Sequence, residues 1–280
     1  MTKGGRLVRN YHALVRRVLN KGVQKGGPQA EDTLAIFGAQ LRFSMKRGFP
    51  LITTRSLKGS IRALIHELLW FISGSTNVAD LHRHDVHLWD QWATAEISGQ
   101  MGYAPGELGP IYGKQWRAFG PNSFDQLLWV EQEIKRNPES RRLIISAWNP
   151  EDAERVFVAP CHCFMQFLVL GGKLHLHLYQ RSADVPVGVP FNIASYSLLL
   201  MMMAQTTGYE PGDFIHSFGD THVYLNQIPY MEELLRREPR ALPNMHINHS
   251  PASVVDFTFD DFRLEGYDPH PAIKGIPVAL

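Results

Sequence analysis

The most constraining feature of this sequence is segment 192–209, NIASYSLLLMMMAQTTGY, which is apolar through most of its length. A helix that is apolar on every side must be surrounded by the rest of the protein, so it sets the centre of the fold. Its apolar centre, SYSLLLMMMAQ at 195–205, is far shorter than the roughly 20 residues that cross a bilayer. We therefore expect a buried central helix and no membrane partner.

The other segments predict both helices and strands. The run 56–75 has apolar residues at helical spacing, with Ser60 as the N-cap and Gly74 as the stop. Segment 163–182 predicts a hairpin that turns at its Gly-Gly pair. Further helices are predicted at 1–20 and 123–138, and further strands at 33–45, 141–149 and 246–264. Because helices and strands do not alternate regularly, the pattern predicts one α+β domain over 1–280 rather than a doubly wound sheet.

Charge and cysteine content exclude several classes of protein. The formal net charge of +1 argues against a dedicated nucleic-acid binder, so no nucleic-acid partner is expected. Basic residues interrupt every apolar run near the N-terminus, which is unlike a signal peptide. Two cysteines cannot form a disulfide framework, and free thiols fit a reducing compartment. These observations predict a cytoplasmic protein.

Both cysteines lie in VAPCHCFMQF, residues 158–167, and this segment has several possible uses. A zinc site needs further ligands, and neighbours on a strand point to opposite faces, so no metal site is expected. The spacing is also not that of a C-x-x-C redox pair. Two interpretations remain open: a structural pair of buried cysteines, or a nucleophile at Cys161. Pro160 places Cys161 at a loop edge, which favours chemistry, whereas Cys163 lies deeper in the strand.

The run YQRSADVPVGVPFN, residues 179–192, is typical of a ligand site. Arg181 and Ser182 at a strand end could hold a phosphate. Asn192 is either a helix cap or an amide that reads the edge of a pyrimidine. Glu67 precedes an apolar run, where burial would raise its pKa, but an isolated glutamate on a helix is often solvated. The residues alone therefore predict an enzyme that handles a phosphorylated small molecule.

Several ordered motifs together resemble those of the thymidylate synthase family, in its folate-dependent form with a cysteine nucleophile. These motifs are HELLWFISGSTNVADLH, WDQWA, GPIYGKQWR, SRRLIISAWN, APCH, LYQRSADVPVGVPFNIASY, GDTHVYLN, EGYDPHPAIK and IPVAL. The similarity runs from about residue 8 to the C-terminus. It implies a homodimer with a large mixed β-sheet at the dimer interface, and transfer of a one-carbon unit from 5,10-methylenetetrahydrofolate to C5 of a pyrimidine nucleoside monophosphate.

The resemblance also implies roles for individual residues. The expected catalytic residues are Cys161, Glu67, Tyr112, Asn192, His162 and Asp184. The expected nucleotide-binding residues are Arg181, Ser182, Arg141, Arg142, Asn192, His222, Tyr224 and Gln180, with Arg141 and Arg142 donated by the partner subunit. The expected folate-binding residues are Trp89, Trp92, Asp184, Gly188, Phe191, Val278 and Ala279. In these roles Cys161 adds to C6 of the base, Glu67 handles protons near O4, and Tyr112 assists removal of the C5 proton.

One loop departs from the family pattern. At 27–32 the chain has GPQAED where the family usually has DRTGTG, so Pro28 replaces a phosphate-binding arginine, and two acids follow it. Lys25 or Lys21 could compensate for the lost charge.

The resemblance as a whole implies dUMP-to-dTMP synthesis with release of dihydrofolate as the leading function. A pyrimidine nucleotide hydroxymethylase and an idle, nucleotide- or RNA-binding regulator are the alternatives.

Overall fold

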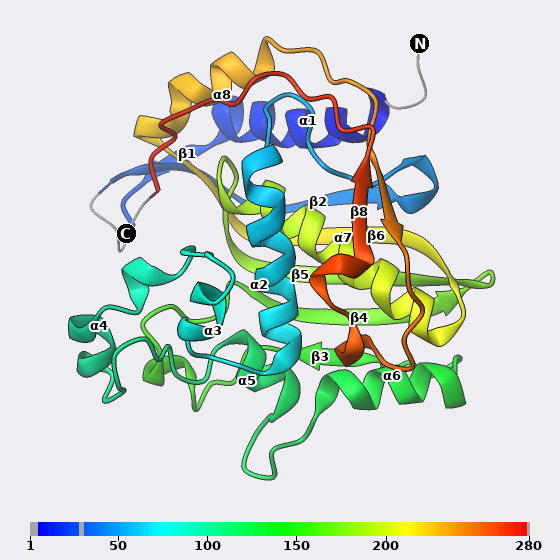
Figure 1. Cartoon of the computed structure of the whole chain (residues 1–280). Coiled ribbons are helices and arrows are strands. Elements are labelled where there is room, and N and C mark those ends of the chain that lie inside the picture. Colours follow the sequence, from blue (N-terminus) through cyan, green and yellow to red (C-terminus); the bar gives the residue numbers. More distant parts are fainter. Residues whose placement is uncertain (1–4, 28–30, 279–280) are drawn as a thin grey trace.

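Six strands form one mixed sheet in the order β1-β2-β6-β5-β4-β3. The protein is described from a computed structural model that covers residues 5–27 and 31–278 (Figure 1). The strands are β1 (Val23–Lys25), β2 (Thr33–Ser44), β3 (Ile144–Ser146), β4 (His162–Leu170), β5 (Lys173–Asp184) and β6 (Glu210–Tyr224). All neighbours are antiparallel except β5 and β6, which are parallel. This sheet and its helices confirm the predicted α+β class.

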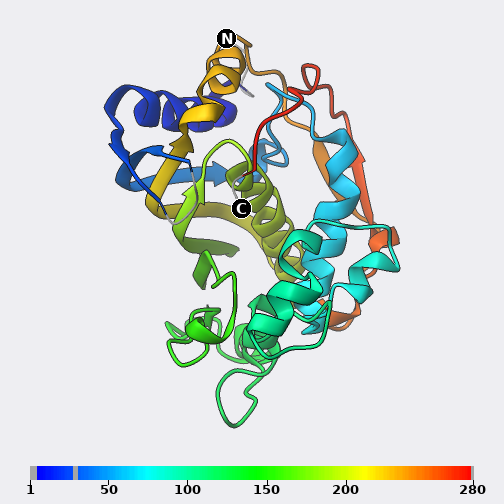
Figure 2. The same cartoon turned by 90° about the vertical axis from the view of Figure 1, so that its left-hand side faces the viewer.

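The predicted central helix is α7 (Gly188–Thr207), which packs on β5 and β6. On its other side lies α2 (Ile61–Ser73), so α7 is enclosed between the sheet and a second helix (Figure 2). Thirteen of its side chains are buried, on all faces, which matches its uniformly apolar sequence. Gly208 ends the helix in the left-handed conformation, with φ of 80°. Among the described helices, none is long and apolar enough to cross a membrane.

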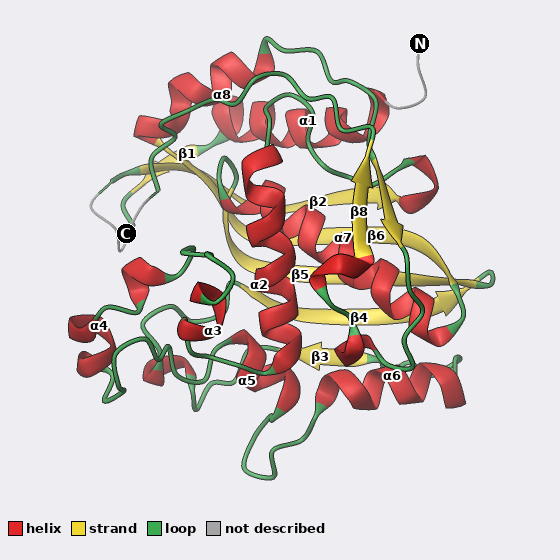
Figure 3. Cartoon of the chain, in the orientation of Figure 1, coloured by secondary structure: helices red, strands yellow, loops and turns green. Residues whose placement is uncertain are grey.

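Shorter elements surround this centre (Figure 3). The remaining helices are α1 (Gly5–Lys21), α3 (Ala79–His82), α4 (Ala95–Gln100), α5 (Tyr112–Arg117), α6 (Gln126–Arg136) and α8 (Ile228–Leu235). A separate two-stranded sheet consists of β7 (Asn244–Ile247) and β8 (Phe262–Glu265). The hairpin between β4 and β5 turns at Gly171 and Gly172 as predicted, and both have positive φ.

Two sequence predictions need correction. Segment 246–264 is not continuous strand: its middle part is loop and two short 3₁₀ turns, because Pro251 and two Asp-containing turns interrupt the pairing. Ser60 occupies the position before α2 but its side chain forms no capping hydrogen bond. By contrast, Asp125 caps α6 by accepting a hydrogen bond from the Leu128 amide at 3.0 Å.

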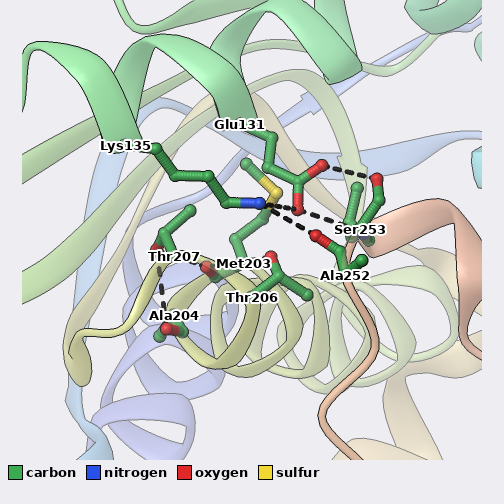
Figure 4. A network of polar contacts seen from close by, with 9 residues as sticks. Glu131, Lys135, Met203, Ala204, Thr206, Thr207, Ala252 and Ser253 are labelled. Atoms are coloured by element: carbon green, nitrogen blue, oxygen red, sulfur yellow. Dashed lines mark hydrogen bonds and ion pairs between the residues drawn. The ribbon is translucent and has the colours of Figure 1, made fainter.

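A buried carboxylate ties α6 to the C-terminal part of the chain (Figure 4). Glu131 is only 1% exposed and accepts hydrogen bonds from the Ser253 hydroxyl at 2.6 Å and the Val254 amide at 3.0 Å. Lys135 approaches the same carboxylate at 3.3 Å and donates to the Ala252 carbonyl at 2.9 Å. This network anchors segment 252–254 against the helix that supports the sheet edge.

We expect Glu131→Ala to lower the free energy of unfolding by about 2–3 kcal/mol, because it leaves the buried Val254 amide and the half-buried Ser253 hydroxyl without an acceptor. Gln132→Ala is the matched control, since Gln132 is the next residue on the same helix and is exposed. Urea titration of both variants measures the difference. Equal midpoints in the two variants would contradict the anchoring role of Glu131.

Candidate active site

Cys161 lies immediately before β4, at a local irregularity of the sheet. His162 pairs with Gln180 while Phe164 pairs with Tyr179, so Cys163 is an extra residue on β4 and forms a β-bulge. The carbonyl of Cys163 accepts amide hydrogen bonds from Ala147 at 2.9 Å and Trp148 at 3.2 Å. A bulge of this kind re-aims the neighbouring side chains, and both His162 and Cys163 are buried as a result.

Arg181 organises the loop that carries the thiol. Its Nη2 donates to the Ala159 carbonyl at 2.7 Å and its Nε to the Pro160 carbonyl at 3.0 Å. The same Nη2 lies 3.9 Å from the Cys161 Sγ, and the guanidinium lies over the Trp148 ring at 5.3 Å. Burial raises the pKa of the Cys161 thiol, and the positive charge of Arg181 opposes this rise only in part. The thiol is therefore protonated at neutral pH before a ligand arrives.

An aromatic wall stands beside Cys161. The Cys161 amide donates to the Tyr112 hydroxyl at 2.8 Å, and the Tyr112 ring stacks on His162 at 4.1 Å. His162 Nδ1 in turn lies 2.5 Å from the Tyr196 hydroxyl of α7. Burial lowers the pKa of His162 to about 3 and raises that of Tyr112 well above 10. Burial also raises the pKa of Tyr196, so the side chains of Tyr112, His162 and Tyr196 are all uncharged at neutral pH.

Glu67, on α2, faces the same region. Its Oε1 accepts a hydrogen bond from the Trp89 indole at 2.7 Å, although the two residues are 22 positions apart. Burial raises the pKa of Glu67 to about 7, and the indole hydrogen bond offsets only part of the shift. The carboxyl group is thus poised to exchange a proton near neutrality.

The end of β5 and the start of α7 present further candidates. Asp184 accepts from the Val187 amide at 3.2 Å and from Gln227 Nε2 at 3.4 Å, and burial raises its pKa. Asn192 lies in the second turn of α7, four residues after its start at Gly188, so it is not a cap. Its Oδ1 lies 3.6 Å from the Cβ position of Gly188, and Phe191 beside it is partly exposed.

Two of the predicted nucleotide-binding residues, His222 and Tyr224, lie two positions apart on β6. The rings of His222 and Tyr224 pack edge to face at 5.2 Å, and His222 Nδ1 lies 3.0 Å from Asp220 Oδ1. Asp220 also forms an ion pair with Lys25. Burial raises the pKa of Tyr224 to about 12, so its hydroxyl keeps its proton. Lys25 is thus already paired, whereas Lys21, the other lysine expected to compensate for Pro28, is exposed at the end of α1 and forms no ion pair with another described residue. Pro28 itself lies outside the described residues.

The other predicted residues divide into two groups. Gln180 is buried and bonded internally, to His216 Nε2 at 2.9 Å and to the Ser182 carbonyl at 2.9 Å, so it supports the strand end. Arg141 and Arg142 are exposed before β3, and neither forms an ion pair with another described residue. Ala279 lies outside the described residues, whereas Val278 is exposed.

The comparison with known families supplies the deciding observation: residues 9–279 match the model described as thymidylate synthase. The chain belongs to the thymidylate synthase family. Members of this family transfer a one-carbon unit to a pyrimidine nucleotide and use methylenetetrahydrofolate as its donor, so the protein is a one-carbon transferase. The predicted family assignment is confirmed over nearly the whole chain.

A small cleft lies next to this site, beside the Trp89 indole. Its walls include Trp89, Trp92, Leu108, Ile111 and Val158. The rings of Trp89 and Trp92 meet edge to face at 5.5 Å, and such aromatic walls favour planar ligands. Both tryptophans were predicted as folate-binding residues of this family member.

Three residues that contact the candidate site residues were not predicted from the sequence. Trp148 lies on Arg181, Tyr196 bonds His162, and Gln227 joins Asp184 to the Pro277 carbonyl at 2.9 Å. Each is recognised only through its partner, because a Trp after a strand, a Tyr in an apolar helix and a Gln after a strand are common in ordinary packing. Trp148 and Tyr196 stand in the family motifs SRRLIISAWN and LYQRSADVPVGVPFNIASY, but a motif does not show which side chain each of them contacts.

Proposed function

We propose that the protein is a thymidylate synthase, which converts dUMP to dTMP and releases dihydrofolate. The observation that carries the proposal is the Cys161 thiol beside the Arg181 guanidinium, 3.9 Å apart, in a chain of the thymidylate synthase family. The domain that performs the reaction is the single α+β unit of residues 1–280. The cytoplasmic location expected from the sequence stays a prediction.

In this proposal Cys161 is the nucleophile. Its sulfur forms a bond to C6 of the uracil, the electron pair of the C5–C6 bond moves toward O4, and C5 becomes a carbon nucleophile. The thiol proton must leave first, and the guanidinium of Arg181 favours the thiolate electrostatically. Later loss of the C5 proton is assisted by the Tyr112 hydroxyl, which is within hydrogen-bond distance of the Cys161 amide.

Glu67 and Asn192 act on the polar edge of the base. Glu67 is assigned to proton exchange at O4, since a carboxyl group with a pKa of about 7 can both give and accept a proton near neutral pH. Asn192 is assigned to the N3–O4 edge, where its amide offers one donor and one acceptor. His162 stays neutral and supports Tyr112 by stacking.

We expect Asn192→Asp to lower kcat/KM for dUMP by about 10²-fold and to raise it for dCMP, because a carboxyl group pairs better with the cytosine amino group. Steady-state rates with the two nucleotides, together with binding of dUMP by calorimetry, measure the switch. Asn226→Asp, a substitution of the same type after β6, is the control and should leave the preference for dUMP unchanged. A variant of Asn192 that still prefers dUMP to the same degree would remove this residue from base recognition.

Phosphate binding is assigned to Arg181 and Ser182 from one subunit and to Arg141 and Arg142 from the partner. Exposed aromatic side chains on the strands of the sheet support a homodimer. Phe37, Phe164 and Tyr179 are 87%, 40% and 39% exposed, and Phe164 and Tyr179 are neighbours across β4 and β5. Large apolar side chains that are exposed together in this way are typical of protein interfaces.

Folate binding is assigned to Trp89, Trp92, Asp184, Phe191 and the C-terminal residues 278–279, with Gly188 allowing close approach. When bound, methylenetetrahydrofolate supplies the one-carbon unit and the hydride. Asp184, which is half-buried and has a raised pKa, offers an oxygen to the pterin ring nitrogens. Gln227 connects this acid to the tail through Pro277, and closure of the tail excludes water from the site.

A pyrimidine nucleotide hydroxymethylase is the second candidate, and the loop at 27–32 favours it. That loop lacks the usual arginine, and the nearby Lys25 is held by Asp220, so the phosphate or sugar environment differs from that of an ordinary synthase. In such an enzyme, water rather than hydride completes the reaction.

Product analysis tests the proposal directly. The purified enzyme is incubated with methylenetetrahydrofolate and each of dUMP, UMP, dCMP and CMP, and the products are identified by mass spectrometry. A methylated dUMP product together with dihydrofolate is expected. A hydroxymethylated nucleotide together with tetrahydrofolate would overturn the synthase assignment in favour of the second candidate. Absence of any product, with nucleotide binding retained, would favour a regulatory relative.

A further inference from the structure

Two histidines and an aspartate converge on the loop that leads into Trp89. His82 Nε2 lies 2.7 Å from Asp90 Oδ1, and His87 Nδ1 lies 2.7 Å from Asp90 Oδ2. One ligand atom from each residue lies within 4.8 Å of the others. The roles assigned to the active site use none of these three side chains. From this geometry we propose a binding site for a divalent transition-metal ion such as Zn²⁺ at His82, His87 and Asp90.

The donor set matches the chemistry of such ions. Two imidazole nitrogens and one carboxylate oxygen, with a water molecule in the fourth position, form a common tetrahedral zinc arrangement. Zinc–nitrogen bonds of about 2.0–2.1 Å place neighbouring ligand atoms roughly 3.3 Å apart. The present separations need only small side-chain rotations, which are easy because the His82 and His87 side chains are 42% and 58% exposed. Imidazole ligands also discriminate against Mg²⁺ and Ca²⁺, which prefer oxygen.

The surroundings hold the ligands in place. The three ligands are interspersed with the buried side chains of Leu81, Val86 and Trp89, which fix the backbone on either side. The second nitrogen of His87 lies 3.4 Å from Asp85 Oδ1. A carboxylate on the far nitrogen of a ligating histidine orients the ring and strengthens its basicity, as at many metal sites.

Occupancy of this site would act next to the catalytic cleft. Trp89 directly precedes Asp90, and its indole donates to Glu67. A metal ion that joins the end of α3 to Asp90 therefore restrains the segment that presents Trp89. The predicted consequence is a more stable loop rather than a new catalytic group.

The test uses full-length protein without a polyhistidine tag, treated with a chelator and then titrated with Zn²⁺ or Co²⁺ at about pH 8, because the hydrogen bond with Asp90 raises the pKa of His87 and a ligating imidazole must be neutral. Calorimetry should show one equivalent of Zn²⁺ per chain, and bound Co²⁺ should give the visible absorption of a four-coordinate site. His87→Ala should weaken Zn²⁺ binding at least about 10-fold, and Asp85→Asn should weaken it by about 10-fold as loss of an outer partner.

His249→Ala is the matched control, because His249 is also exposed but lies in the loop after β7. It should bind Zn²⁺ as the unmodified protein does. Circular dichroism of each variant without metal establishes that the fold is intact. Equal Zn²⁺ affinity and stoichiometry in His87→Ala and the unmodified protein would overturn the proposal and assign the binding to adventitious surface contacts.

Discussion

Replacement of Cys161 by serine is expected to lower kcat at least about 10³-fold while nucleotide binding is retained. The serine hydroxyl has a far higher pKa than a thiol, and burial at this position already opposes ionisation. Arg181 can still hold the loop, because two of its hydrogen bonds go to the carbonyls of Ala159 and Pro160 rather than to the sulfur. The residual rate is measured from the product formed in long incubations, which are quenched and analysed by mass spectrometry.

Cys163→Ser is the matched control for this experiment. Cys163 is only 6% exposed, and its Sγ lies 3.8 Å from the Tyr179 carbonyl, to which a serine hydroxyl can also donate. We expect its turnover to remain within about threefold of the unmodified enzyme, since the change removes no group that contacts the base. Undiminished turnover in Cys161→Ser would show that the nucleophile has been wrongly assigned.

Glu67→Gln is expected to slow turnover by about 10²–10⁴-fold and to stabilise the fold at alkaline pH. The folded-state pKa of about 7 lies above the ordinary 4.5, so folding favours the protonated carboxyl. The contribution of this group to stability is therefore greatest below pH 4.5 and is lost as the pH rises through 7. Glutamine removes this pH-dependent cost and keeps an oxygen acceptor for the Trp89 indole.

Thermal unfolding of Glu67→Gln and the unmodified protein between about pH 5 and pH 8 measures this effect. The variant should gain stability progressively with pH, by about 2–3 kcal/mol at pH 8, because a shift of one pKa unit corresponds to about 1.4 kcal/mol. Glu232→Gln, an exposed position on α8, should show no such trend. A parallel pH dependence of the two proteins would mean that Glu67 ionises in the fold as freely as in water.

The sequence predicted the parts of this fold that depend on local pattern. The apolar run of α7, the amphipathic helix α6 and the glycine turn between β4 and β5 follow from helical periodicity and turn residues, whereas the cap predicted at Ser60 does not form. The segment of β6 was not predicted as a strand, although this strand lies in the middle of the sheet. It contains glycines, acidic residues and the fully buried His216, which hide the apolar alternation expected of a strand.

The candidate site shows the same division. Cys161, Arg181 and Asn192 stand in short motifs, so both their chemistry and the family resemblance could be recognised from the sequence. The contact between Glu67 and Trp89 depends on how α2 packs against a distant loop, and the ion pair of Lys25 with Asp220 joins positions 195 residues apart. Pairings of this kind arise only from the tertiary fold. The sequence could not show that Lys25 is paired with Asp220, and this ion pair argues against the expectation that Lys25 binds the phosphate.

The bulge at Cys163 has a consequence for how this chain can vary. β5 has no extra residue opposite Cys163, so deletion of one residue between Cys161 and Met165 would restore regular pairing and turn the Cys161 thiol to the other face of the sheet. An insertion would add a second irregularity at the place where Ala147 and Trp148 bind the Cys163 carbonyl. Natural or engineered relatives that keep the chemistry can therefore change side chains in this segment, but they cannot change its length by one residue.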